Sequence, residues 1–295
     1  MKKLLITGAS GLIGRSLMKH CHNRFDVIGT YNTTDYKPDN SVLKKLNLTD
    51  TAELEQCLDA INPEVVIHTA AVSSISGCEK DPKLTEEVNY RASAQLAAFC
   101  VRKDIRLIYL SSDMVFNGVK GNYSEDDEPH PINQYGKSKY SAEEAIKGIC
   151  QNYVIARLNL VYGKGDAVKK SFTDELLIAN WSGKSYPVFK DQVRSPISLN
   201  AATRAIRELA EGNFEGVYHL GGLEPINRLD FAKKFISMFH LVPEIIEEAD
   251  VPEELQGIYP MNTSFDVSKA KGDLKTVLMT IEEGLDLEYG KPQVQ

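Results

Sequence analysis

The glycine-rich stretch near the start of the chain constrains the fold more than any other feature. Residues 4–7 form a short, mostly apolar run, and Gly8, Gly11 and Gly14 follow it at three-residue intervals. Glycines in such a strand–helix turn permit a tight bend, a close approach of the backbone to a phosphate, and close packing of the helix on the strand. The free amides and the dipole at the start of the helix favour an anion. Because the apolar residues of segment 12–18 lie on one helix face, we predict a dinucleotide site rather than an ordinary strand–helix turn.

Strand and helix patterns alternate through the first 160 residues. The predicted strands are 4–7, 25–30, 64–71, 106–112 and 153–160, and the main helices between them are 50–61, 84–101 and 133–148. This alternation predicts an α/β fold with a Rossmann-type, doubly wound parallel sheet and right-handed crossovers.

Beyond this point the pattern loosens. We predict an NAD(P)-binding Rossmann domain over residues 1–162 and a smaller C-terminal α/β lobe, which binds the substrate, mainly over residues 163–295. A segment from about residue 193 to residue 222 is expected to return to the first domain. Helices are predicted at 172–179, 200–210 and 227–239, and strands at 186–189 and 217–220.

Composition narrows the class of partner. Of the 295 residues, 42% are hydrophobic and 25% are charged, as in an ordinary soluble protein, and the net charge is −7. An acidic chain without a Lys/Arg-rich run is a poor partner for nucleic acid or an anionic membrane. The five cysteines are far apart, which favours a reducing compartment over a disulfide framework or a zinc site. Since no apolar span of about twenty residues occurs, we expect a cytoplasmic protein with no membrane partner and no bound metal.

Two predicted strand ends carry information about the cofactor. The second strand ends at residues 30–32 (TYN), where an Asp or Glu would accept a hydrogen bond from the ribose 2′-hydroxyl and an Arg would pair with a 2′-phosphate. Neither kind of residue stands there, and the missing carboxylate removes one objection to NADP(H). NADP(H) is the expected cofactor and NAD(H) the alternative. Strand 64–71 ends in Ala70 and Ala71, whose small side chains leave room for a ligand. His68 is expected to pack or to form hydrogen bonds rather than to act in catalysis.

Tyr135 and Lys139 form the second organising feature. Residues four apart share one helix face, and a lysine ammonium beside a phenol lowers the pKa of the phenol from its usual value of about 10. Tyr135 is therefore a candidate general acid–base for interconverting a carbonyl and an alcohol, and Lys139 could also hold a ribose hydroxyl. Ser112, at the end of a predicted strand, could donate a hydrogen bond to the substrate oxygen.

Together these features resemble the extended short-chain dehydrogenase/reductase superfamily. The matching residues are 7–14 (TGASGLIG), the strand end 68–71, Ser112, Tyr135 and Lys139. The resemblance implies hydride chemistry on a sugar nucleotide, with Ser112, Tyr135 and Lys139 as the catalytic set. The expected cofactor contacts are Gly8, Ser10, Gly11, Leu12, Ile13, Gly14, Leu48, Ala70, Ala71, Tyr135 and Lys139.

Three further segments resemble the dTDP-4-dehydrorhamnose reductase branch of this superfamily. Residues 111–118 (SSDMVFNG) are similar to its S-T-D-Y-V-F-D-G motif, and residues 191–196 (DQVRSP) to its D-Q-x-G-x-P motif. Residues 261–266 (MNTSFD) are similar to the end of its R-P-x-N-x-x-L-D motif.

The chain departs from that branch at three positions. Met114 replaces a tyrosine, Tyr259 stands where an arginine precedes the proline, and Arg194 replaces a glycine. The pair Asp113-Met114 also lacks the glutamate that dehydratases of the superfamily need as a second acid–base group, which argues against a dehydratase. Ser112, Asp113 and Arg194 are the candidate substrate contacts. Asp113 could instead cap a turn, and Arg194 could either hold a diphosphate by a bidentate contact or lie on the surface.

The resemblance implies an NAD(P)H-dependent reductase of a nucleotide-linked 4-keto-6-deoxy sugar, dTDP-4-dehydrorhamnose reductase above all. The same branch resembles the regulatory β subunit of methionine adenosyltransferase, so a non-catalytic, nucleotide-binding subunit is the alternative from another class. A sugar-nucleotide epimerase is the third alternative. The expected partner is a nucleotide-sugar substrate, with a homodimer left open.

Overall fold

A sheet of seven parallel strands lies at the centre of the structure, a computed structural model that describes residues 1–34, 42–165 and 169–290. The strand order is β11-β6-β5-β4-β1-β2-β3, and each neighbouring pair is parallel. The strands are β1 (Lys2–Thr7), β2 (Phe25–Tyr31), β3 (Val42–Lys45), β4 (Val65–His68), β5 (Arg106–Ser112), β6 (Tyr153–Leu158) and β11 (Gly216–Leu220). This arrangement confirms the predicted Rossmann-type α/β fold.

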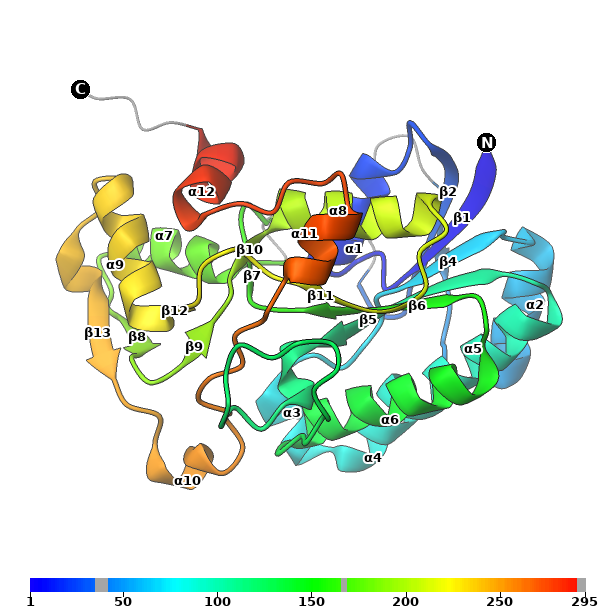
Figure 1. The fold of residues 1–295 in the computed structure, drawn as a ribbon, viewed down its shortest axis with the longest axis horizontal. Helices are drawn as coiled ribbons and strands as arrows, with labels where there is room; N and C mark the ends of the chain where they lie inside the picture. Colours follow the sequence, from blue (N-terminus) through cyan, green and yellow to red (C-terminus); the bar gives the residue numbers. More distant parts are fainter. Residues whose placement is uncertain (35–41, 166–168, 291–295) are drawn as a thin grey trace.

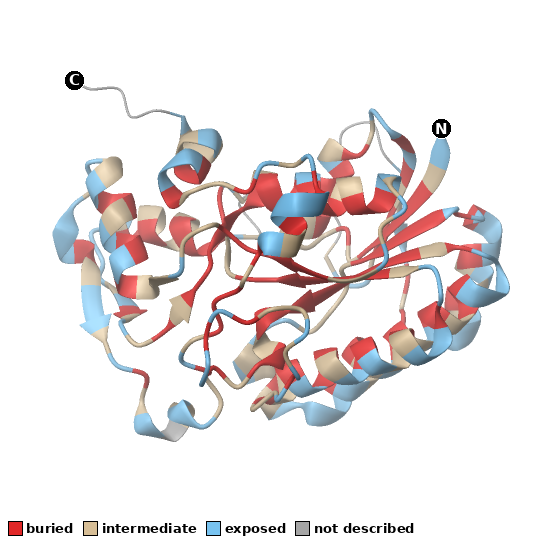
Figure 2. Ribbon diagram, in the orientation of Figure 1, coloured by how far each residue is buried: buried red, intermediate tan, exposed pale blue. Residues whose placement is uncertain are grey.

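Helices cover both faces of the sheet (Figure 1). Successive strand residues point to opposite faces, so Leu4 and Ile6 join the core beneath α1, α8 and α11, whereas Leu5 joins the core beneath α2, α5 and α6. The buried residues accordingly run through the middle of the molecule (Figure 2). The helices of the first face are α1 (Leu12–His20), α8 (Leu199–Glu211) and α11 (Ser268–Asp273), and those of the second are α2 (Thr51–Ile61), α3 (Ile75–Lys80), α4 (Pro82–Thr85), α5 (Ala92–Arg102) and α6 (Gln134–Ile149).

A second, smaller core lies beside the sheet. Phe172, Leu176, Phe231 and Phe235 are buried at its centre. Its elements, with the short strands that connect it to the sheet, are β7 (Val161–Tyr162), α7 (Phe172–Ser182), β8 (Tyr186–Phe189), β9 (Val193–Arg194), β10 (Ile197–Ser198), β12 (Ile226–Asn227), α9 (Arg228–Met238), β13 (Ile246–Ala249), α10 (Glu253–Gln256) and α12 (Ile281–Tyr289). Although α8 and β11 come after β8 and β9 in the chain, α8 packs on α1 and β11 pairs with β6. The exact division of the chain at residue 162 stays a prediction.

The helix predicted over residues 84–101 differs from the structure. The chain forms α4, then a π-helical segment, Glu86–Arg91, and then α5. In the π-helical segment the Asn89 amide accepts from the backbone N–H of Val72 (2.8 Å) and donates to its carbonyl (3.0 Å) and to Ser138 Oγ (3.0 Å). The local departure from the α-helix thus joins the loop after β4 to α6, and apolar periodicity does not report such a turn.

Helix α6, which carries Tyr135 and Lys139, is fixed to the sheet by a buried ion pair. Arg157 of β6 binds Glu143 of α6 through two nitrogens, with the shortest contact at 2.6 Å from Nη2 to Oε2. The two side chains are only 1% and 0% exposed. His219 of β11 lies against the other side of the guanidinium, 3.3 Å from Nη1 to Nε2. Because this pair is shielded from water, removing one charge leaves the other uncompensated.

We predict that Glu143→Gln lowers the free energy of unfolding by about 3–5 kcal/mol, since the buried Arg157 loses its counter-charge. Urea unfolding monitored by circular dichroism measures this loss. The matched control is Glu55→Gln, which breaks the exposed pair between Glu55 and Arg102 and should cost less than about 1 kcal/mol. Equal losses in the two variants would contradict the role assigned to the buried pair.

Candidate active site

One cleft brings together the residues singled out from the sequence. It has a volume of about 790 Å³ and runs between the carboxyl edge of the sheet and the second core. Every predicted site residue lines it, although their roles stay predictions: Gly8, Ser10, Gly11, Leu12, Ile13, Gly14, Leu48, Ala70, Ala71, Ser112, Asp113, Tyr135, Lys139 and Arg194. Parallel pairing explains the convergence, because it places Thr7 beside His68 and His68 beside Tyr109, so the three strands end at one edge.

The turn after β1 fits a dinucleotide phosphate. Gly8 has a φ of +67°, and a Cβ placed there would lie 2.6 Å from the backbone of Ala70. A Cβ on Gly14 would lie 2.3 Å from the carbonyl oxygen of Gly8. Helix α1 has no side-chain cap at Gly11 and no acidic residue in its first turn. Its amino-terminal N–H groups are therefore open to an anion at the place where the backbone allows the closest approach.

The part of the cleft beside the end of β2 could hold an adenosine ribose. No carboxylate is among the described residues that line it there. Among the described residues, this end is lined by Thr30, Tyr31, Asn32, Thr33, Thr34, Leu46, Asn47, Leu48 and Thr49. Over the described lining as a whole, Asp113 is the only acidic residue, whereas the cationic ones are Lys139, Lys169, Lys170, Arg194 and Arg228. The cleft is thus cationic, although the whole chain carries a charge of −7.

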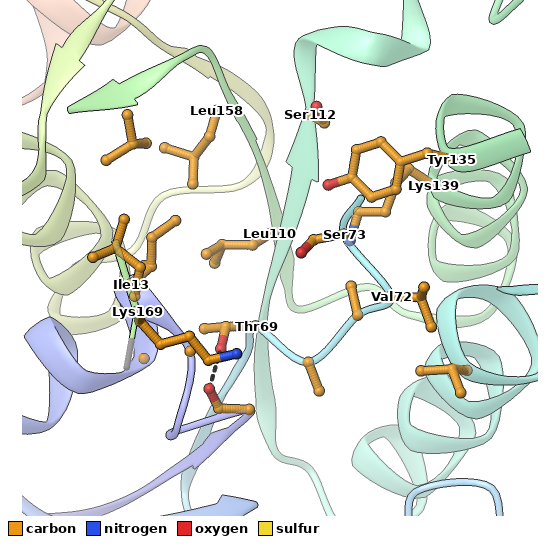
Figure 3. A pocket seen from close by; sticks show the side chains of 18 of the residues that line it. Ile13, Thr69, Val72, Ser73, Leu110, Ser112, Tyr135, Lys139, Leu158 and Lys169 are labelled. Carbon is orange, nitrogen blue, oxygen red and sulfur yellow. Dashed lines mark hydrogen bonds between the residues drawn. The ribbon is translucent and has the colours of Figure 1, made fainter. Parts of the chain in front are cut away.

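Tyr135 and Lys139 project from α6 toward the end of β5 (Figure 3). The amino terminus of α6 is set by Asn133, whose side chain accepts from the N–H of Gly136 (2.7 Å) and donates to the carbonyl of Ile258 (2.8 Å). This cap fixes the start of the helix and joins it to the second lobe.

Ser112 lies across from Tyr135 in the same view. Its hydroxyl accepts from the N–H of Met114 (3.2 Å) and donates to Asp113 Oδ1 (3.0 Å). A carbonyl placed between Ser112 and Tyr135 could accept a hydrogen bond from each hydroxyl.

Burial, rather than Lys139, has the largest effect on the pKa of Tyr135. Desolvation raises the pKa of Tyr135 well above its usual range, and only the hydrogen bond with Ser112 acts to lower it. Desolvation lowers the pKa of Lys139 to about 7, against the attraction of Glu143. Lys139 Nζ lies 4.2 Å from the centre of the Tyr109 ring, which offers a weak cation–π contact. In the protein alone, desolvation therefore outweighs any lowering of the Tyr135 pKa by Lys139, and the role expected of Lys139 stays a prediction.

Asp113 is engaged within the protein. It is 4% exposed and accepts hydrogen bonds from Ser112 and Thr263, and its Oδ2 lies 3.3 Å from Arg194 Nε. Desolvation raises the pKa of the Asp113 carboxyl, and the charge of Arg194 opposes that rise. The Asp113 side chain does not cap the turn, because the N–H of Met114 donates to Ser112 instead.

Arg194 is a buried arginine, so the surface alternative is wrong. It is 3% exposed and is held by Asp113 and by three backbone carbonyls, those of Val193, Pro260 and Met261. Most of its donors are used in joining β9 to the segment near residue 260. A bidentate contact with a diphosphate would require some of these bonds to break.

His68 behaves as the sequence led us to expect. It is 1% exposed, and its Nδ1 and Nε2 lie 2.6 Å from Thr7 Oγ1 and 2.9 Å from Ser93 Oγ. Burial lowers the pKa of His68 to about 3, which keeps the ring neutral. It joins β1, β4 and α5 below the cleft.

Several residues of the cleft wall were not predicted from the sequence. Among them are Lys169, which reaches toward Thr69 across the cleft (Figure 3), and Gln192 and Arg228 from the second lobe. Gln192 belongs to the segment that matches a branch motif, so its position could have been found. Arg228 carries no sequence signal, because it is the first residue of a helix whose packing decides where it points.

The described residues form neither a cluster of metal ligands nor a membrane-spanning helix. Within residues 1–34, 42–165 and 169–290, no three His, Cys, Asp or Glu side chains are grouped as metal ligands would be. Over the same part of the chain, no helix combines the length and the apolar character needed to cross a bilayer.

Comparison with known proteins shows the family of the chain and relatives of two kinds, reductases and a methionine adenosyltransferase subunit. A family model described as the RmlD substrate binding domain matches residues 1–289. The chain is 30% identical over 293 residues to the probable low-salt glycan biosynthesis reductase Agl14 of Haloferax volcanii, covering 95% of each chain. It is 31% identical to the methionine adenosyltransferase 2 subunit beta of Xenopus laevis, covering 81% of this chain and 73% of that one. A solved structure of a hypothetical dTDP-4-dehydrorhamnose reductase from Sulfolobus tokodaii superposes with a TM-score of 0.83 at 32% identity, covering 94% and 97%.

We predict that Gly14→Ala weakens cofactor binding at least about tenfold and costs about 1–3 kcal/mol of stability, because the new methyl group meets backbone that cannot rotate away. Fluorescence titration with NADPH and thermal unfolding measure the two effects. Gly148→Ala is the matched control: it lies in α6, where the added Cβ would meet no described atom within 4 Å apart from its chain neighbours and the backbone of its own helix, and should be neutral or stabilising by about 0.5–1 kcal/mol. Unchanged NADPH affinity in Gly14→Ala would rule out the phosphate at this turn.

Proposed function

The chain belongs to the RmlD substrate binding domain family, and from that membership we propose that it is an NADPH-dependent reductase of a nucleotide-linked 4-keto-6-deoxy sugar, with dTDP-4-dehydrorhamnose as the substrate. The observation that carries the proposal is the convergence of Ser112, Tyr135 and Lys139 beside the glycine turn in one cationic cleft. The likeness to the Sulfolobus tokodaii protein supports the choice of substrate. Five unpaired cysteine thiols support a reducing, cytoplasmic setting.

The three side chains divide the work of reducing a ketone. A reduced nicotinamide, when bound, supplies the hydride that the carbonyl carbon receives. Ser112 turns its hydroxyl from Asp113 to the carbonyl oxygen and stabilises the negative charge that develops there. Tyr135 Oη donates the proton that completes the alcohol, and its raised pKa keeps it in the acid form that this step needs. Lys139 stabilises the phenolate left behind and holds a ribose hydroxyl.

The preference for NADPH rests on the β2 end of the cleft. NAD-specific sites usually place a carboxylate on the ribose 2′-hydroxyl, and that carboxylate would repel a 2′-phosphate. The described lining at this end has neutral side chains alone, including Thr30, Tyr31 and Asn32. We therefore propose that a 2′-phosphate is accepted there, with NADH as the weaker cofactor.

We predict that Tyr135→Phe lowers kcat about 10²- to 10⁴-fold, because the phenyl ring cannot donate the proton. Loss of NADPH absorbance, with dTDP-4-keto-6-deoxy-L-mannose generated in situ, measures turnover. Tyr140→Phe is the matched control on the same helix, since its hydroxyl makes only a 3.4 Å contact with Glu128, and it should retain wild-type kcat. Wild-type protein that binds NADPH but reduces no nucleotide keto-sugar would overturn the proposed reaction.

A regulatory role is the second candidate, and the relatives support it. The likeness to methionine adenosyltransferase 2 subunit beta extends over 81% of the chain at an identity similar to that of the reductases. A subunit of this kind would keep the nucleotide cleft and bind a catalytic partner. Size-exclusion chromatography with a methionine adenosyltransferase catalytic subunit tests it: co-elution together with absent turnover favours the regulatory role, and turnover without co-elution favours the reductase.

A further inference from the structure

The ammonium group of Lys139 is buried beside a carboxylate that another cation already holds. Lys139 is 2% exposed, and Glu143 lies one turn further along the same helix. Both oxygens of Glu143 accept hydrogen bonds from Arg157. Glu143 therefore attracts Lys139 through its charge, and the charge of Arg157 offsets part of that attraction. A buried ammonium in such surroundings needs a further source of stabilisation.

Tyr109 offers the face of its ring to this ammonium. Lys139 Nζ lies over the ring, 4.2 Å from its centre. Tyr109 is 0% exposed and lies in β5, where it pairs with His68 of β4 on one side and with Ile155 of β6 on the other. The rings of His68 and Tyr109 are 5.7 Å apart at their centres. Because the ring is packed within the sheet, it cannot turn away from Lys139.

This contact favours an ammonium over a neutral amine. An aromatic face carries partial negative charge and attracts a cation, and the attraction grows when both partners are out of water. Within the described chain Tyr109 Oη has no hydrogen-bond partner, so Tyr109 meets Lys139 with its ring face rather than with its hydroxyl. The ring therefore opposes the desolvation that disfavours the charged form of Lys139.

The proposed reaction requires Lys139 in its charged form. An ammonium stabilises the phenolate that Tyr135 leaves after it donates its proton, whereas a neutral amine does not. Desolvation lowers the pKa of Lys139 to about 7, so the charged and neutral forms are similarly populated at neutral pH. A neighbour that shifts this balance changes the fraction of protein that is ready to react.

We propose that Tyr109 is a positioning residue for this reaction, whose ring holds the Lys139 ammonium in place beside Tyr135 (Figure 3). The proposal rests on the proposed function and deepens it. Tyr109 is not among the described residues that line the cleft, so it acts through Lys139 and does not touch the reacting atoms.

The other groups that face Lys139 keep their charge near neutral pH. Burial raises the pKa of the Tyr109 and Tyr135 phenols and of the Cys78 thiol, so all three stay neutral. Burial lowers the pKa of His68 to about 3, which keeps its ring neutral as well. A change in activity around pH 7 therefore reports on Lys139. The titratable groups that face it are Tyr135 and Glu143 on α6, Cys78 on α3, His68 on β4 and Tyr109 on β5.

The test compares Tyr109→Leu with the wild type across pH in the NADPH-dependent reduction of the keto-sugar. Without the ring, the pKa of Lys139 should fall by about 0.5–1.5 pH units. Above neutral pH the charged fraction, and with it kcat/KM, should then drop about 3- to 30-fold. At about pH 5.5 the loss should shrink to about twofold or less, because Lys139 is charged in both proteins. Tyr109→Phe restores the ring face and should rescue the pH profile.

A direct measurement of the Lys139 charge does not depend on turnover. With isotope-labelled lysine, the Lys139 side chain can be titrated by NMR, and its signal is assigned from its absence in Lys139→Met. The titration midpoint should move down in Tyr109→Leu and return in Tyr109→Phe. If Tyr109→Leu does not fold, phenylalanines with increasing numbers of fluorine atoms at position 109 weaken the ring face at nearly constant shape, and the midpoint should fall with each added fluorine.

Tyr153→Leu is the matched control. Tyr153 packs on the same core as Tyr109, but it begins β6 and is not among the described residues of the cleft lining. The change should leave the Lys139 midpoint and the pH profile as they are in the wild type.

An unchanged Lys139 midpoint in folded Tyr109→Leu overturns the positioning role while the reductase proposal stands. A loss of kcat/KM that is equal at every pH also overturns it, because a purely structural role of the ring predicts that result. A midpoint that falls when the ring is removed, in a protein whose wild type reduces no keto-sugar, supports the hold of Tyr109 on Lys139 and overturns the reductase instead.

Discussion

The parallel pairing of β1, β4 and β5 is the constraint on which the rest of the structure depends. It ends three buried strands at one edge, so the glycine turn, the loop after His68 and the hydroxyl of Ser112 must lie around a common space. Helix α6 then brings Tyr135 and Lys139 to that space, because Glu143 is held to Arg157 in the sheet. A shift of one element would separate the phosphate turn from the proton donor.

Burial sets the chemistry of the cleft as much as residue identity does. It keeps Tyr135 a phenol, makes the Lys139 ammonium less stable, and leaves His68 neutral. The pair of Asp113 and Arg194 shows the opposite solution, in which two buried charges compensate each other and join the two lobes. The same low-dielectric surroundings therefore keep Tyr135 protonated as a proton donor, and close by they enclose the ion pair that joins the two lobes.

Sequence reasoning recovered the sheet, the glycine turn and the placement of the catalytic candidates, because each depends on local patterns: apolar runs, glycine spacing and the four-residue interval from Tyr135 to Lys139. It missed the π-helical segment around Asn89, since one inserted residue hardly changes the apolar periodicity. For Arg194 it left two roles open: the surface position is wrong, and the diphosphate contact is untested. It also overlooked Arg228. The surroundings of both arginines come from segments distant in the chain, such as Asp113 and Phe172, and only tertiary packing brings these together.

The contrast between a cationic cleft and an acidic exterior has a kinetic consequence. Five cationic side chains and one carboxylate line the described cleft, while the whole chain carries a charge of −7. An anionic ligand is repelled at long range by the surface and attracted only once it nears the cleft mouth. Added salt screens both effects over a Debye length of about 8–10 Å. Association rates should therefore depend on ionic strength much less than the charge of the cleft alone would suggest, because the two contributions oppose each other.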